Sequence, residues 1–196
     1  MTTLRAFIAV DLSPEIRTGI EALVARLRRM PGQECMRFVS ASGIHLTLKF
    51  LGDIPADLGD RLQEALERAA AARPAFSARV RGAGCFPDHG RPRVIWVGLE
   101  EPRGELTALQ RGIDAECVAL GLLAEDRPFS PHLTLGRVRR EAGVEAASFV
   151  RSVLEREQAV DLGEMTVDSV HLYRSDLRPS GAEYRRLHSA VLDAGR

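Results

Sequence analysis

Apolar and polar positions follow two different periods along this chain, and each period predicts one kind of element. Residues 5–12 are rich in β-forming side chains and stop at Ser13 and Pro14, where serine can cap a helix and proline can begin one. Over residues 15–30 the apolar positions recur at helical spacing. The chain is therefore predicted to begin with a strand followed by a helix.

The same alternation continues to the end of the chain. Further strands are predicted at residues 36–39, 44–51, 76–80, 94–99, 132–138, 165–173 and 184–192, the last two forming a hairpin. Further helices are predicted at residues 56–72, 103–120 and 144–155, and a loop rich in glycine and proline at residues 82–93. Strands that alternate with amphipathic helices predict a layered architecture of sheets and helices, here as a single domain over residues 1–196.

One tetrapeptide of a strand-forming kind occurs twice, as His-Leu-Thr-Leu beginning at His45 and again at His132. Successive side chains of a strand point to opposite faces, so the histidine and threonine of each copy share one face and the two leucines share the other. A repeat of this kind, once in each half of the chain, predicts a duplicated lobe.

The repeated motif carries groups that suit chemistry at phosphorus. A neutral imidazole can take a proton from a nucleophile while an imidazolium gives one to the leaving oxygen, so His45 and His132 are the candidate acid and base. The hydroxyls of Thr47 and Thr134 would hold the non-bridging oxygens. The residues alone do not distinguish which histidine donates the proton. The other histidines, His89, His171 and His188, are expected to be structural or solvent-facing.

The net charge and the lack of metal-binding motifs reduce the number of candidate functions. The net charge is zero, which argues against wholesale coating of nucleic acid. Lys49 is the only lysine, and arginine, which grips phosphate through two parallel hydrogen bonds, supplies the other basic residues. Neither a carboxylate cluster nor an H-E-x-x-H pattern occurs, so we expect neither a metal nor a cofactor.

A few residues near the motifs are candidates for substrate binding. We expect at least one of Arg5, Arg137 and Arg139 to support phosphate binding, although strict alternation would point Arg137 away from the face of His132. Phe7 and Trp96 are aromatic residues that could stack on a base.

The cysteines and the apolar runs indicate in which compartment of the cell the protein is expected. Three cysteines at wide spacings predict neither a disulfide framework nor a zinc site. No run approaches the roughly 18 apolar residues of a membrane span, and the N-terminus is unlike a signal peptide. We therefore expect a soluble, cytoplasmic protein. We also expect it to act as a monomer, although neither the cysteines nor the apolar runs bear on the oligomeric state.

Four segments, in this order, carry a family resemblance: RAFIAVDLSPEI, GIHLTLKFLGDI, PRVIWVGL and RPFSPHLTLGRVR. Together they resemble the two-histidine phosphoesterase superfamily and, within it, the RNA 2′,3′-cyclic phosphodiesterases, historically called 2′-5′ RNA ligases. The resemblance implies an α+β, bilobal fold. Each lobe would contribute an antiparallel sheet with flanking helices and one H-x-T strand to a central groove.

The resemblance also implies a reaction. Water would attack a 2′,3′-cyclic phosphate at an RNA end, such as that of a tRNA fragment, and leave a 2′-phosphomonoester. His45 would be the proton donor and His132 the proton acceptor. Attack by an RNA 5′-hydroxyl instead of water would give ATP-independent 2′-5′ ligation as a side activity.

Two other functions stay open at this point. One is a phosphodiesterase for small cyclic nucleotides or 2′-5′ oligoadenylates. The other is a non-catalytic protein that binds RNA ends. Comparing turnover of a cyclic-phosphate-ended oligonucleotide with that of a mononucleotide separates the first, and binding without hydrolysis would identify the second.

Overall fold

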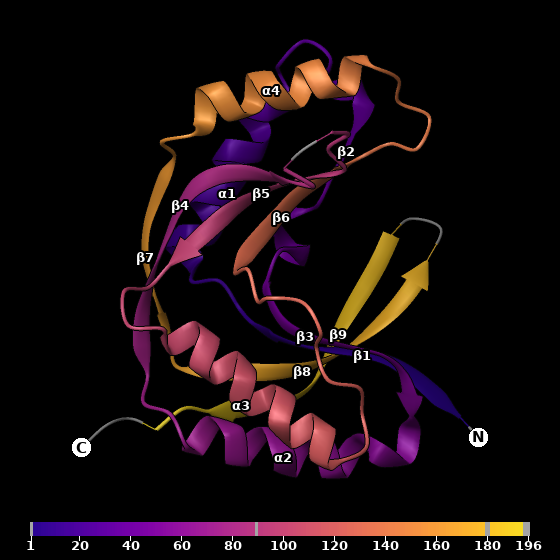
Figure 1. Cartoon of the computed structure of the whole chain (residues 1–196), viewed down its shortest axis with the longest axis vertical. Coiled ribbons are helices and arrows are strands. Elements are labelled where there is room, and N and C mark those ends of the chain that lie inside the picture. Colours follow the sequence, from indigo (N-terminus) through magenta and orange to yellow (C-terminus); the bar gives the residue numbers. More distant parts are fainter. Residues whose placement is uncertain (1, 89, 179–180, 194–196) are drawn as a thin grey trace.

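Two antiparallel sheets form the centre of the structure, a computed structural model that describes residues 2–88, 90–178 and 181–193 (Figure 1). Sheet A has the strand order β3-β1-β8-β9, with β1 at Thr3–Val10, β3 at Leu46–Pro55, β8 at Ser169–Arg178 and β9 at Gly181–Val191. Sheet B has the order β2-β6-β5-β4-β7, with β2 at Met36–Phe38, β4 at Phe76–Phe86, β5 at Val94–Glu100, β6 at His132–Val138 and β7 at Asp161–Val167.

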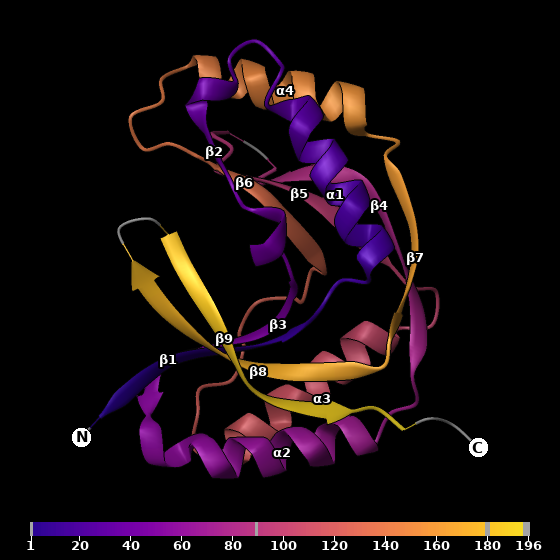
Figure 2. The same cartoon turned by 180° about the vertical axis from the view of Figure 1, so that it is seen from behind.

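Each sheet is covered by helices on one side. The helices are α1 (Pro14–Leu27), α2 (Gly59–Ala71), α3 (Glu105–Ala119) and α4 (Glu145–Glu157), with short 3₁₀ turns at Gln33–Cys35, Ala41–Gly43 and Ala56–Leu58. Helices α2 and α3 pack on sheet A, and α1 and α4 pack on sheet B (Figure 2). The predicted α+β fold with antiparallel sheets and flanking helices is confirmed. We call the side of each sheet that is turned away from its helices its inner face.

Helix α1 shows how the local sequence sets an element. The Ser13 side chain accepts a hydrogen bond from the Ile16 amide at 3.3 Å, and Pro14 occupies the first helical position, as predicted. The helix buries Ile20 and Leu23, which are both fully covered. Burial of one such side chain stabilises the fold by roughly 1.5–3 kcal/mol. The apolar stripe of α1 therefore fixes it on sheet B.

The two sheets are interlaced along the chain, so neither consists of a continuous half of the sequence. Sheet A combines β1 and β3 from the start of the chain with β8 and β9 from its end. Sheet B takes β2, which lies between β1 and β3 in sequence, together with the middle of the chain. The pattern of a strand predicts which of its sides is buried but not which distant strand it pairs with.

Two predicted strands differ from the structure for local reasons. Residues 165–173 were expected to form one strand, but β7 ends at Val167 in sheet B and β8 begins at Ser169 in sheet A, so the chain changes sheets at Asp168. Strand β4 continues through part of the predicted loop because Gly82, at φ 70°, forms a bulge within it. The predicted C-terminal hairpin is β8–β9.

Two further features concern the whole described structure. No helix in residues 2–88, 90–178 and 181–193 is long and apolar enough to cross a membrane. Cys35, Cys85 and Cys117 are free and buried. Burial raises the pKa of the Cys117 thiol to about 11. These thiols are therefore packed as small apolar side chains.

Candidate active site

The repeated tetrapeptide lies at the start of β3 in sheet A and at the start of β6 in sheet B, and these two strands lie next to each other where the two sheets meet (Figures 1 and 2). His45 immediately precedes β3 of sheet A, and His132 is the first residue of β6 in sheet B. Residues of β3 and β6 approach within 8 Å of each other at Cα. Both histidines and both motif threonines, Thr47 and Thr134, are half-buried, whereas the leucines between them are fully buried. The fold thus brings both motifs to one place.

Both imidazoles are tied to the backbone in the same way. The Nδ1 atom of His132 lies 2.7 Å from the carbonyl oxygen of Ser130, and the ring of His45 is hydrogen-bonded to the backbone of Gly43. In each case the partner is two residues earlier in the chain. A ring N–H that donates to a carbonyl fixes the tautomer, so the other nitrogen of His132, Nε2, is left to exchange a proton with a ligand.

The imidazole of His45 packs against aromatic side chains. Its ring stacks on Phe7 with centroids 4.6 Å apart and meets the edge of Tyr184 at 5.2 Å. Phe7 is only 1% exposed because Tyr173, Phe50 and Tyr184 also pack around it. This corrects the expectation that Phe7 contacts substrate. Its ring is covered by its neighbours, and it instead supports the imidazole of His45.

Burial also sets the charge of His45. Burial lowers the pKa of His45 to about 4, because the charged ring loses its hydration. The negative charge of Asp11 and the hydrogen bond to Gly43 raise the pKa again, but only in part. His45 is therefore neutral at neutral pH in the unliganded protein. A proton on this ring needs a further negative charge nearby.

A polar network that the sequence did not reveal lies beside these rings. The hydroxyl of Tyr173 donates to Asp11 Oδ1 at 2.7 Å, and the Arg186 guanidinium pairs with the other Asp11 oxygen. Arg186 also lies 5.8 Å over the Tyr173 ring. Asp11 follows β1, whereas Tyr173 and Arg186 come from the C-terminal hairpin. No local signal in the sequence could have joined them, because their proximity depends on the pairing of β1 with β8.

His171 belongs to the same network. It is 6% exposed, its Nδ1 lies 2.9 Å from Ser189 Oγ, and its Nε2 lies 3.8 Å from Asp11 Oδ2. Burial lowers the pKa of His171, which favours the neutral ring. The contacts agree with the structural role expected for His171. His188 pairs with Glu67 of α2 at 2.8 Å, and His89 lies outside the described residues.

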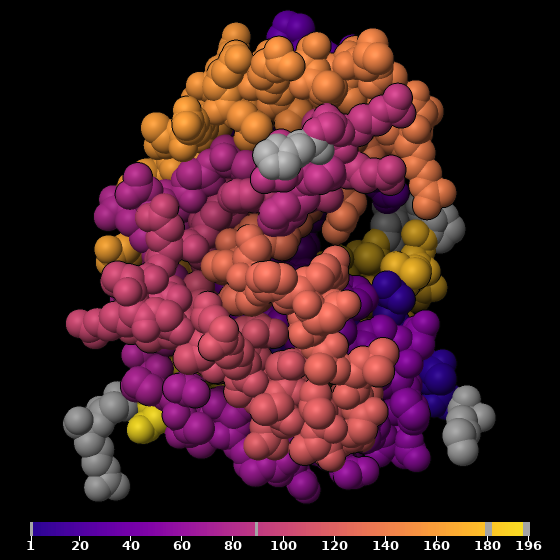
Figure 3. All heavy atoms as spheres, viewed as in Figure 1, coloured from indigo at the N-terminus to yellow at the C-terminus, as the bar shows by residue number. Residues whose placement is uncertain are grey.

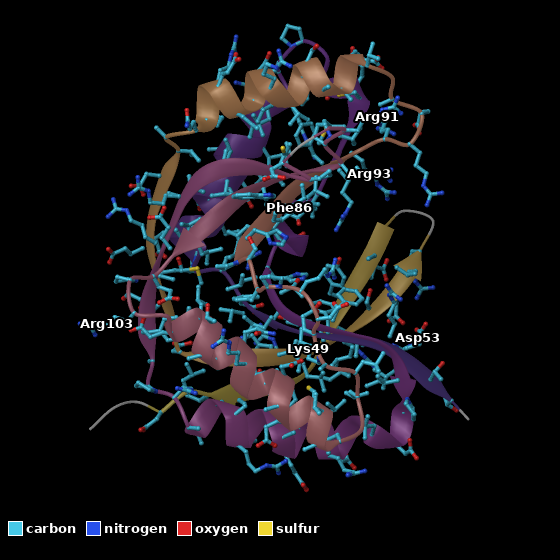
Figure 4. The ribbon with its side chains drawn as sticks, in the orientation of Figure 1. Lys49, Asp53, Phe86, Arg91, Arg93 and Arg103 are labelled. Atoms are coloured by element: carbon cyan, nitrogen blue, oxygen red, sulfur yellow. The ribbon has the colours of Figure 1, made fainter. Side chains whose placement is uncertain are left out.

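Aromatic side chains also surround His132, on sheet B. Phe86, labelled in Figure 4, meets its ring edge-on at a centroid distance of 4.9 Å. The Trp96 ring lies 6.3 Å from it. The Trp96 indole covers Gly84 so closely that a Cβ there would come within 2.2 Å of it. Within the described part of the chain, its buried Nε1 has no hydrogen-bond partner. Trp96, a candidate for base stacking, thus lies on the same inner face as His132.

Each motif strand contains a β-bulge at the second leucine of its tetrapeptide. Leu48 is the extra residue of β3 against β1, and Leu135 is the extra residue of β6 against β5. In β6, Thr134 lies opposite Trp96 and Arg137 lies opposite Val94, which puts Arg137 on the inner face. Strict alternation had predicted the other face. A bulge reverses the alternation beyond it, and such bulges often occur next to active sites.

The three predicted arginines have different surroundings. Arg5 lies on the inner face of sheet A, with its guanidinium 5.0 Å over the Phe50 ring. Arg137 lies on the inner face of sheet B. Arg139 donates from Nε to the Glu34 carbonyl at 2.9 Å and so ties the end of β6 to the turn before β2. The structure therefore brings Arg5 and Arg137, but not Arg139, to the inner faces.

The bulge in β3 turns Lys49 toward the helices. There its ammonium group contacts Asp114 and Leu123, and we call these contacts the Lys49 clamp. Lys49 is 4% exposed, pairs with Asp114 of α3 and donates to the Leu123 carbonyl at 2.8 Å. Asp114 Oδ1 also accepts from the Glu125 amide at 3.1 Å. Figure 4 shows Lys49 where β3, α3 and the segment leading to β6 meet. The clamp thus joins the His45 strand to the segment that delivers His132.

A groove opens on the His45 side of the site, with a volume of about 1230 Å³. It runs between α1, residues 37–43 and the β8–β9 hairpin, and Figure 3 shows the hollow beside this hairpin. Tyr184 and Gly43, which both contact His45, are among its lining residues. The groove is therefore continuous with the surroundings of this imidazole.

The residues that the structure describes include no group of three or more His, Cys, Asp and Glu side chains placed to hold a metal ion. The polar groups at the site are imidazoles, hydroxyls, guanidiniums and the Asp11 carboxylate. This set can transfer protons through the histidines and bind an anion through the hydroxyls and guanidiniums.

Comparison with known proteins identifies close relatives in sequence. The family model of the 2′-5′ RNA ligase superfamily matches residues 14–179. The RNA 2′,3′-cyclic phosphodiesterase of Methanothermobacter thermautotrophicus is 35% identical over 181 residues, which cover 92% of this chain and 95% of that protein. The RNA 2′,3′-cyclic phosphodiesterase of Archaeoglobus fulgidus is 34% identical over 184 residues, covering 94% and 98%.

Solved structures of similar proteins also match this chain over nearly its whole length. TT0787 of Thermus thermophilus superposes with a TM-score of 0.80 at 30% identity, covering 98% of this chain and 100% of that one. LigT of E. coli complexed with 3′-AMP superposes with a TM-score of 0.77 at 27% identity, covering 98% and 99%. Sequence and fold agree over nearly the whole chain, and the protein therefore belongs to the 2′-5′ RNA ligase superfamily.

Proposed function

We propose that this protein hydrolyses 2′,3′-cyclic phosphates at RNA ends to 2′-phosphomonoesters. The observation that carries the proposal is the meeting of two H-x-T motifs, one from each sheet, with both imidazoles anchored to the backbone two residues earlier. The names of relatives that match nearly the whole chain support the same activity. Two tautomer-fixed histidines beside hydroxyl groups suit acid–base displacement at phosphorus.

In the proposed mechanism His132 accepts a proton from water as the water oxygen bonds to phosphorus. The bond from phosphorus to the 3′ oxygen breaks, and His45 gives its proton to that oxygen. Thr47 and Thr134 hold the non-bridging oxygens, where negative charge grows in the transition state. Arg5 and Arg137 are the proposed phosphate-binding arginines, because both lie on inner faces. Binding, orientation and proton transfer are then supplied by side chains of this chain.

Three further points belong to the proposal. Ligation by an RNA 5′-hydroxyl is a side activity, because water at high concentration competes with a scarce RNA end. The substrate RNAs include fragments such as those of tRNA. The protein acts as a monomer in the cytoplasm, a reducing compartment in which free thiols such as Cys35 persist.

The test uses an RNA oligonucleotide that ends in a 2′,3′-cyclic phosphate, incubated with the protein in excess chelator. We expect a 2′-phosphate as the product, identified by mass spectrometry and by resistance to an enzyme specific for 3′-phosphates. A 3′-phosphate product would overturn the proposed bond cleavage. Tight binding of the oligonucleotide without turnover would favour the RNA-end binding protein, and turnover confined to mononucleotides would favour the small cyclic nucleotide enzyme.

Titration of His45 tests its role as proton donor. Its pKa of about 4 in the free protein leaves it neutral at neutral pH, so the donor role requires the negative charge of the bound phosphate to raise this pKa until the ring takes up a proton from solvent. A negative charge within about 4–6 Å favours the protonated ring, so we expect phosphate or 3′-AMP to raise the pKa of His45 by one unit or more. The measurement is an NMR titration of the ring C–H signals, with and without ligand.

The variant His45→Gln assigns the signal, because its spectrum lacks that resonance and keeps the others. If the pKa of His45 stays near 4 with ligand bound, this ring cannot donate a proton at neutral pH. The acid and base roles of the two histidines would then have to be exchanged.

A further inference from the structure

The groove beside His45 is larger than the reacting cyclic phosphate needs. Its volume is about 1230 Å³, whereas pockets of roughly 300–1,000 Å³ hold single drug-sized ligands. One wall is formed by α1 and residues 37–43, and the opposite wall by the end of the β8–β9 hairpin. The groove therefore has room for more than one nucleotide.

Its charge favours an anion. Four arginines line it against two glutamates: Arg28, Arg37, Arg137 and Arg178, with Glu21 and Glu183. Arg37 and Arg137 stand directly opposite each other in the pairing of β2 with β6. Residues that stand directly opposite each other in an antiparallel pair project from the same face, so both guanidiniums lie on the groove side of sheet B. Arginine on both walls suits a ligand that carries phosphates along its length.

Flat side chains accompany the charges. The Arg28 guanidinium lies 5.7 Å over the Phe38 ring, and Tyr184, which is 40% exposed, faces the groove from the hairpin. Unpaired bases stack on aromatic rings and on guanidinium planes, and this is the usual way in which proteins bind single-stranded RNA. The lining thus offers stacking surfaces as well as phosphate contacts.

The groove also begins at the proposed catalytic group. Tyr184 contacts His45 at 5.2 Å, and Gly43, whose backbone holds the His45 ring, lines the groove. A cyclic phosphate sits at the 3′ end of an RNA, so the rest of the strand extends from it in the 5′ direction. We propose that this groove binds the single-stranded nucleotides immediately 5′ of the cyclic phosphate, an inference that rests on the proposed function.

The test compares kcat/KM for a mononucleotide 2′,3′-cyclic phosphate with that for single-stranded oligonucleotides of two to six nucleotides ending in the same group. We expect kcat/KM of the wild type to rise with length, mainly through a lower KM. The double variant Arg28→Gln, Arg178→Gln removes one cation from each wall. It should reduce the ratio of oligonucleotide to mononucleotide kcat/KM on the order of tenfold. The dependence of KM on salt should weaken by a slope of about 0.7 for each lost phosphate contact.

The matched control is Arg103→Gln, which removes the same charge from an exposed arginine far from the groove (Figure 4). It should leave the ratio unchanged. Equal kcat/KM for all lengths would overturn the groove proposal while leaving the proposed function intact. A length preference that survives in the double variant would also overturn it, because the preference would then arise elsewhere. Failure to turn over any of these substrates would instead contradict the proposed function.

Discussion

Replacing either His45 or His132 with alanine should lower kcat on a cyclic-phosphate-ended RNA by about 10²- to 10⁴-fold, the usual contribution of a positioned acid or base. Each imidazole is hydrogen-bonded to the backbone two residues earlier, which fixes its position, and alanine removes the ring that would transfer the proton. In the proposed mechanism the two histidines act on one reaction step, so the double variant should lose little more than either single variant. The measurement is steady-state turnover under saturating substrate.

His188→Ala is the matched control, because His188 pairs with Glu67 of α2 on the helix-covered side of sheet A. Its kcat should stay close to the wild-type value. Circular dichroism and thermal melting of all variants distinguish lost chemistry from lost folding. Near-normal turnover by either His45→Ala or His132→Ala in a folded protein would rule out the two-histidine mechanism.

Breaking the Lys49 clamp should have the largest effect on stability. The side chains of Lys49 and Asp114 are 3% and 20% exposed. Asp114→Ala would leave the Lys49 ammonium buried with the Leu123 carbonyl as its one remaining hydrogen-bond partner among the described residues. Removal of one member of a buried ion pair typically costs about 3–5 kcal/mol. We expect a loss of that order in the free energy of unfolding, measured by urea denaturation. We also expect a lower kcat, because the clamp holds the segment that leads to His132.

A double-mutant cycle completes this test. The variant Lys49→Met, Asp114→Leu removes both charges and should lose less stability than the two single changes would predict together. The control is the exposed pair of Arg68 and Glu116, whose disruption by Arg68→Met should cost less than about 1 kcal/mol. Equal losses for Asp114→Ala and Arg68→Met would show that the clamp is an ordinary surface contact.

The local sequence predicted the elements and motifs whose causes are local. Strand β6 has the predicted bounds, and α1 begins at the predicted serine cap. The repeated tetrapeptide pointed to the two histidines that the fold brings to one place. Their roles as acid and base stay a prediction, as do those of Thr47 and Thr134. Periodicity and capping depend on residues within a few positions, which is why they can be read from the chain directly.

The features of the site that the sequence did not predict depend on pairing between strands that are distant in the chain. Phe7 could not be recognised as a support for His45, because it is the pairing of β1 with β3 and β8 that surrounds its ring. Arg137 was assigned to the wrong face because the bulge at Leu135 arises only against β5. Asp11, Tyr173 and Arg186 were missed because the contact of Tyr173 with Asp11 joins residues separated by 162 positions.

The interlacing of the two sheets has a consequence for how the protein is made. Strands β1 and β3 are synthesised before the middle of the chain, whereas β8, which pairs with the side of β1 that β3 leaves free, is synthesised only after β7. Sheet A therefore cannot close before all strands of sheet B, the last of which ends at Val167, have been synthesised. During synthesis the free side of β1 therefore remains an unpaired edge of the kind that promotes aggregation. The β8–β9 hairpin removes this edge when β8 pairs with β1.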